Sequence, residues 1–229
     1  SFYERIRSPL SDLEDGYAYL RDVGRGTQGT LSLAVLPSIA ADVATRQLAR
    51  FQQSHPDVRI TLRERKHGEL LDGVREGAVE FGIGVMLRPD RELSFQYLFS
   101  DYLMFVMPEG HPLARLPPQW KTLERFPFIY VGTGNAEYAL TSAHVRAMPT
   151  MEVEHVATAL EMVRHGMGVS VLPSSIMATQ ALQGMHCVRI QSASAERRMG
   201  LIRKNGRLLG GPARAFVAQL MRDFAPRTA

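Results

Sequence analysis

The stretch from Gly29 to Val85 constrains the fold most, because short apolar runs alternate in it with segments of helical periodicity. Pro37 ends the first run, Ser38 can cap the helix that follows, and Pro56 ends that helix. The apolar runs lie at 29–36, 58–64 and 79–85. Short runs of this kind that alternate with helices are typical of a βαβαβ unit with parallel strands.

A second, similar series follows the first, so the pattern predicts a second α/β unit joined to the first. Further strands are expected at 93–99, 102–107, 128–131, 151–154, 169–172, 188–190 and 199–202. Further helices are expected at 68–77, 137–147 and 155–166, with a short one near 174 and an amphipathic one at 212–224. The fold class predicted is therefore α/β.

The composition fits a globular protein of one large domain or two small α/β lobes, with 229 residues, 45% hydrophobic and 22% charged. The net charge of +4 raises the question of nucleic acid. The one dense basic run, at 63–67, contains Glu64 and sits between two predicted elements, so we interpret it as a solvated loop. No apolar run is long enough for a membrane span, and the single cysteine, Cys187, favours a reducing compartment such as the cytoplasm.

Residues 1–24 differ from the rest and predict a helix with a narrow apolar seam. The seam positions are spaced alternately three and four residues apart, as in a coiled coil, and are Tyr3, Ile6, Leu10, Leu13, Tyr17 and Leu20. Charged residues flank them, so the seam is expected to pair with a second copy. Packing of this helix on its own domain remains the alternative. Pro9 and Gly16 weaken a continuous helix, although Ser8 could cap a new one that starts at Pro9.

No catalytic or metal-binding constellation is found, so binding is expected rather than reaction, and no cofactor or metal is predicted. Cys187 is predicted to be a small buried hydrophobic residue, and Ser174 and Ser175 are predicted to be helix caps. The predicted parallel strands end in short polar or glycine-bearing turns, several of which open helices. Free amides at such helix starts suit a small anion, especially a carboxylate.

Read together, the motifs resemble the effector-binding domain of LysR-type transcriptional regulators along essentially the whole chain. The segments that carry the resemblance are 29–35 with 37–41, 48–51 with 55–56, 69–77, 110–114, 163–173 and 212–216. The resemblance implies a type 2 periplasmic-binding-protein-like fold of two Rossmann-like lobes joined by two crossover strands. Lobe I would comprise 29–100 plus 199–229 and lobe II 101–198, preceded by the end of a linker and dimerisation helix at 1–24. The DNA-binding head is expected to be absent from this chain.

The same resemblance implies where an effector would bind. Contacts are expected from Ser38, from His67, where family members often have Ser or Thr, and from the ends of strands in lobe II. Together with residues in the turns that follow the predicted parallel strands, these contacts give the predicted ligand-binding set. Its members are Pro37, Ser38, Ile39, Glu64, His67, Met86, Thr133, Gly134, Val153, His155 and Pro173.

The function predicted is effector sensing and oligomerisation in a transcriptional regulator. The expected partners are a small-molecule effector, for which a carboxylate is predicted, a second copy in a dimer or tetramer, and DNA only through the absent head. Two alternatives stay open. A periplasmic solute-binding protein would carry an export signal upstream and be a monomer, and an enzyme would turn over a bound small acid.

Overall fold

The computed structural model describes residues 29–132, 135–145, 147–178 and 182–225. These residues form two compact units, and the chain passes between them twice. Unit 1 lies within Ser1–Phe99 and Arg198–Ala229, and unit 2 is Ser100–Arg197. The predicted linker helix at 1–24 lies outside the described residues.

Unit 1 begins with the predicted βαβαβ arrangement. Its elements are β1 (Gly29–Val35), α2 (Pro37–Ile39), the π-helix η1 (Ala40–Ala44), α3 (Thr45–Ser54), β2 (Val58–Glu64), α4 (His67–Arg75), β3 (Phe81–Val85), the first part of β4 (Leu93–Pro108), most of β9 (Glu196–Lys204) and α7 (Gly211–Asp223). The strand order is β2-β1-β3-β9-β4. Strand β1 is parallel to β2 and to β3, whereas β9 is antiparallel to β3. The sheet is therefore mixed, with a parallel βαβαβ part.

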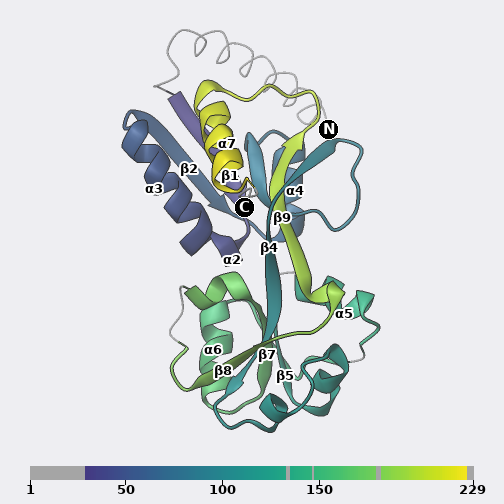
Figure 1. The fold of residues 1–229 in the computed structure, drawn as a ribbon. Coiled ribbons are helices and arrows are strands. Elements are labelled where there is room, and N and C mark those ends of the chain that lie inside the picture. The colour runs from purple at the N-terminus through teal and green to yellow at the C-terminus, as the bar shows by residue number, and fades with distance from the viewer. Residues whose placement is uncertain (1–28, 133–134, 146, 179–181, 226–229) are drawn as a thin grey trace. The chain divides into compact units, whose positions relative to one another are not determined.

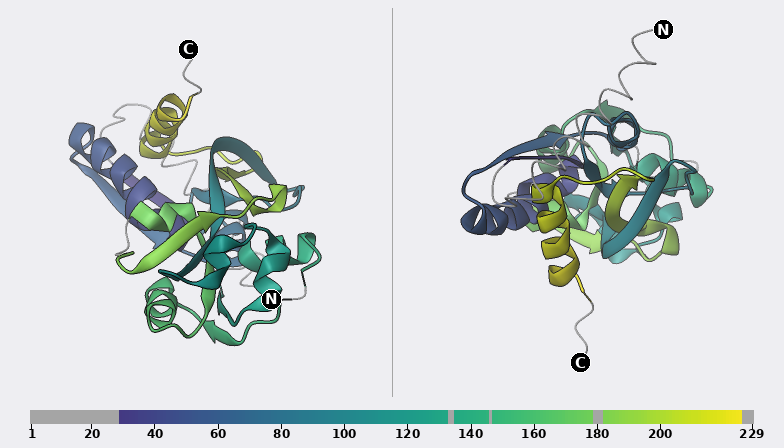
Figure 2. Two further views of the ribbon diagram at one scale, coloured as in Figure 1. Left: turned by 60° about the horizontal axis from the view of Figure 1, so that its bottom comes forward. Right: turned by 90° about the horizontal axis from the view of Figure 1, so that it is seen from above.

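Helices cover both faces of this sheet. Successive residues of β3 point to opposite faces, so this strand contacts helices on both. On one face, Phe81 stacks near Phe216 of α7 with ring centroids 6.2 Å apart. On the other, Gly82 lies so close to Leu70 of α4 that an added Cβ would approach its Cδ2 to 2.6 Å. Helices α3 and α7 lie side by side in all three views (Figure 1, Figure 2), joined by a hydrogen bond from Gln219.

Unit 2 repeats the alternation of strands and helices. It contains the second part of β4, the 3₁₀ helices η2 (Pro112–Arg115) and η3 (Trp120–Arg125), β5 (Phe128–Val131), α5 (Asn135–Ser142), β6 (Met151–Val153), α6 (Val156–Arg164), β7 (Val169–Pro173), η4 (Ser174–Ala178), β8 (Met185–Arg189) and η5 (Ala193–Ala195). Its strand order is β4-β7-β5-β6, and β8 pairs with the other edge of β4. Strand β5 is parallel to β6 and β7.

The core of unit 2 has two layers, one on each face of its sheet. On β4, Phe105 belongs to the layer that contains Trp120 and α5, and its neighbour Val106 belongs to the layer that contains α6. This alternation fits the part of β4 at 102–107, whose sequence is continuously apolar or aromatic, as expected for the interior of an α/β sheet.

Three sequence-based boundaries were wrong for identifiable reasons. The helix predicted from Ser38 begins one residue earlier, with Leu36 at the N-cap and Pro37 in the first turn, so Ser38 is not the cap. Proline suits this position because its missing N–H would have no partner within the helix. The two strands predicted at 93–99 and 102–107 are one strand, β4, which runs without a break through Asp101.

Helix α5 ends at Ser142 rather than near Ala147 because its C-terminus closes in a Schellman motif. The amide of Val145 donates to the carbonyl of Leu140 and the amide of His144 to that of Thr141. His144 accordingly has a left-handed backbone, with φ of 54°. Glycine usually holds such a position, and its absence here hid the end of the helix from sequence reading.

Candidate functional site

In unit 1, the carboxyl ends of three adjacent parallel strands lie at one edge of the sheet. Val35 at the end of β1 is in register with Glu64 at the end of β2 and with Ile83 near the end of β3. The amide of Arg65 donates to the carbonyl of Val35 at 3.0 Å, and that of Leu36 to the carbonyl of Ile83 at 3.3 Å. The turns that follow the three strands are therefore close to one another.

The predicted ligand-binding residues of unit 1 lie in or beside these turns. Pro37 and Glu64 are exposed, and Ser38, His67 and Met86 are half-buried. Ile39 differs from them, because it is fully buried in the core of the unit. Ile39 therefore supports the turn from within the core, and its contact with a ligand stays a prediction.

Unit 2 has an equivalent edge at the ends of β5, β6 and β7. Val131 pairs with Val153, and the amide of Gly132 donates to the carbonyl of Val153 at 3.1 Å, which joins the first two ends. Val153 is half-buried, His155 is exposed and Pro173 is buried. Thr133 and Gly134 lie outside the described residues.

Helices begin at these edges, and no N-cap side chain accepts a hydrogen bond from their first amides. Lys66 precedes α4 and His155 precedes α6, and neither makes a side-chain cap hydrogen bond. The same holds for Leu36 before α2. The first amides of a helix and its dipole favour an anion, and an anionic ligand can take the place that a capping side chain would fill.

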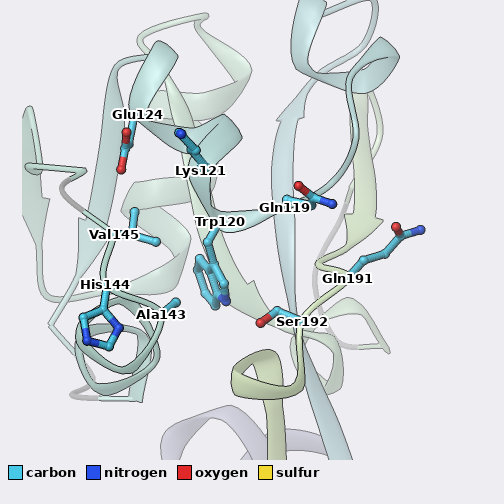
Figure 3. A pocket seen from close by; sticks show the side chains of 9 residues that line it. All are labelled: Gln119, Trp120, Lys121, Glu124, Ala143, His144, Val145, Gln191 and Ser192. Atoms are coloured by element: carbon cyan, nitrogen blue, oxygen red, sulfur yellow. The ribbon is translucent and has the colours of Figure 1, made fainter.

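A pocket of about 500 Å³ lies within unit 2, away from the predicted residues, beside Trp120 and the end of α5. The indole N–H of Trp120 donates to Ser194 Oγ at 2.8 Å, which fixes the ring. Figure 3 shows Gln119 and Gln191 extending to one side of this ring and Lys121 and Glu124 to the other. Because these polar groups diverge, the pocket lacks the convergent polar set that a specific ligand site requires.

The described residues contain no group of three or more His, Cys, Asp or Glu side chains that could hold a metal ion. None of their helices is long and apolar enough to cross a bilayer. Cys187 on β8 is half-buried, and burial raises the pKa of its thiol, which disfavours the reactive thiolate.

Sequence reading missed one feature beside the edge of unit 2, a buried ion pair between Asp101 and Arg197. Ser174 and Ser175, predicted to be helix caps, both donate their hydroxyls to Asp101 instead. The available signal was one acidic residue, Asp101, just before the apolar run at 102–107, but Arg197 lies among other charged residues and is far away in the sequence.

Two α/β units joined by two strands, each with parallel strand ends that open helices, define the class of small-molecule binding domains with a type 2 periplasmic-binding-protein fold. The LysR substrate binding domain family matches residues 24–225, and the chain belongs to this family. A similar curated relative is the uncharacterized HTH-type transcriptional regulator YybE of Bacillus subtilis (strain 168), 22% identical over 98% of this chain and 78% of the relative.

Two solved structures have the same fold. The regulatory domain of CcmR from Synechocystis PCC6803 in complex with 2-PG has a TM-score of 0.77 at 21% identity, over 88% of this chain and 100% of that one. The BenM effector binding domain with its effector benzoate has a TM-score of 0.72 at 20% identity, over 87% and 93% of the two chains. These relatives are regulators, so the comparisons lend no support to a transport protein or to an enzyme.

Proposed function

We propose that this effector-binding domain senses a small anionic metabolite, a carboxylate in the first instance, bound at the carboxyl ends of its parallel strands. The observation that carries the proposal is the pair of sheet edges described above. At each edge, parallel strands end and helices begin whose N-cap residues make no side-chain cap hydrogen bond. Each edge offers amides and a partial positive charge. Benzoate, the effector of the structurally similar BenM domain, is an anion of this class.

Binding would act through a shift between conformations of the regulator in the cytoplasm. A ligand moves such an equilibrium only by its difference in affinity for the two states. The relatives are HTH-type regulators, and DNA would be contacted through a head domain rather than through the two units described here.

The ligand class can be tested by thermal unfolding with matched anions and neutral amides. Benzoate against benzamide and succinate against succinamide form the pairs, each at millimolar concentration. A ligand at 100 times its Kd should raise the Tm by roughly 5–10 °C. An anion should stabilise the protein and its amide should not. Equal shifts with both members of every pair, or no shift with any carboxylate, would contradict the proposal.

Ser38→Trp is expected to abolish binding of the stabilising anion, because the bulky ring would occupy the turn after β1. Calorimetry should show at least a tenfold loss of affinity, while the circular dichroism spectrum stays unchanged. Ala49→Trp is the matched control, since Ala49 is exposed on α3 beyond the edge and should bind as the parent does. Equal affinity in both variants would remove Ser38 from the site.

We also propose that the seam at 1–24 pairs two copies of the chain through its six apolar positions. Leu13→Glu places a charge in the seam and should convert an oligomer into a monomer in multi-angle light scattering at micromolar concentration. Arg7→Glu introduces the same charge on a flanking position and should leave the mass unchanged. A strictly monomeric parent chain would refute the pairing.

A further inference from the structure

The carboxylate of Asp101 is almost completely buried, with 3% of the residue exposed, and it accepts five hydrogen bonds. Its Oδ1 accepts from the amides of Tyr102 at 2.8 Å and Ser175 at 3.0 Å and from the hydroxyl of Ser174. Its Oδ2 accepts from the hydroxyl of Ser175 and from the guanidinium of Arg197, both at 2.9 Å. A buried carboxylate needs such donors, because an isolated one is strongly disfavoured in the protein interior.

The donors come from three separate segments of unit 2. Tyr102 lies on β4 just after the chain enters the unit, and Arg197 is its last residue before the chain leaves. Ser174 and Ser175 directly follow Pro173, the last residue of β7 and a predicted ligand-binding residue. One carboxylate therefore joins both connecting segments to the corner at the carboxyl end of β7, which we define as residues 173–175.

The arrangement couples these segments because they share the two oxygens of one group. Arg197 is 5% exposed, and its burial lowers the pKa of the guanidinium while the charge of Asp101 opposes this effect. Neither charge can move away from the other without leaving a buried ion uncompensated. A displacement of the corner at 173–175 must consequently change the hydrogen bonds of the group that holds both connections.

We propose that Asp101 is a positioning residue for effector sensing. Its carboxylate couples the corner at 173–175 to the two connecting segments, so that a displacement of the corner also displaces both segments. The inference rests on the proposed function in one respect only, namely that an effector contacts this corner. The effector would touch the corner, and Asp101 would transmit the displacement to residues 100–102 and 196–197 without touching the ligand itself.

Hydrogen exchange followed by mass spectrometry tests this coupling in the full chain without any ligand. The variant Ser174→Ala with Ser175→Ala removes two hydroxyl donors to Asp101 and leaves the ion pair intact. It also removes the 3.3 Å hydrogen bond that the amide of Tyr102 donates to Ser174 Oγ, so Ser175→Ala, which keeps this bond, isolates the coupling through Asp101. Amide exchange should become at least tenfold faster in peptides that cover 98–103 and 195–199, as well as in those that cover 172–178. Faster exchange confined to 172–178, or no change anywhere, would overturn the proposal.

Two further variants keep the result interpretable. Ser192→Ala is the matched control, because this hydroxyl of unit 2 bonds to Ser194 rather than to Asp101, and exchange at both connections should stay as in the parent. If the double variant does not fold, as judged by the fluorescence of Trp120, Ser175→Ala alone should give the same pattern with about a threefold change. A change confined to the corner in that variant would equally overturn the proposal.

The absence of anion binding in the thermal experiments would refute the proposed function and leave this exchange result unaffected. Conversely, anion binding together with uncoupled exchange would retain the proposed function and remove the role of Asp101.

Discussion

Asp101→Asn should lower the free energy of unfolding of unit 2 by about 3–5 kcal/mol, the cost of breaking a buried ion pair from one side. The asparagine keeps the size of the side chain and one carbonyl oxygen, but it turns amide protons or a neutral oxygen toward the buried Arg197. Urea unfolding monitored by the fluorescence of Trp120, the one tryptophan of the sequence, reports on unit 2 directly. The midpoint should fall without a change in m.

Arg197→Met is expected to cost less than Asp101→Asn, because Asp101 retains four hydrogen-bond donors. The combined variant Asp101→Asn with Arg197→Met should recover to within about 1 kcal/mol of the parent, since replacing both charges of a buried pair is often nearly neutral. Arg50→Met is the control, because the Arg50–Asp223 pair is exposed at Arg50 and its loss should cost under about 1 kcal/mol. Additive losses in the combined variant would contradict the ion-pair account.

Gly200→Ala should destabilise unit 1 by about 3 kcal/mol, because the strand β9 passes too close to β4 for a side chain. An added Cβ would lie 2.5 Å from the backbone oxygen of Gln96 and against the ring of Phe95. The carbonyl cannot turn away without separating the two strands. Circular dichroism in urea should show the loss, while the fluorescence of Trp120 in unit 2 should report a smaller change.

Two other glycines provide graded controls for this prediction. At Gly82 the added Cβ would meet the end of the flexible Leu70 side chain at 2.6 Å, so about 1 kcal/mol is expected after Leu70 moves. At Gly132 the nearest atom is 3.7 Å away, an ordinary contact, and alanine should be tolerated sterically. Equal effects at Gly200 and Gly132 would show that close approach of backbone is not the cause.

Local sequence patterns were sufficient where neighbours along the chain decide the conformation. The apolar run at 128–131 became β5 with those bounds, and Gly77 follows the end of α4 with a left-handed φ of 78°. Where the local signal was absent, as at His144, or pointed to a break, as at Asp101, the predicted boundaries failed. A polar residue within a strand looks like a turn residue in the sequence, because the partners that stabilise it in the strand are distant along the chain.

The sequence by itself determined the order of strands and helices, the family, and which turns follow the parallel strands, because periodicity, proline and glycine act over a few residues. Only the tertiary structure decided that Ile39 is buried in the core and that Ser174 and Ser175 serve Asp101. The partners of Asp101 lie 74 residues away at Ser175 and 96 residues away at Arg197. Such a buried pair forms because folding brings distant donors around one charge, and no pattern along the chain encodes that distance.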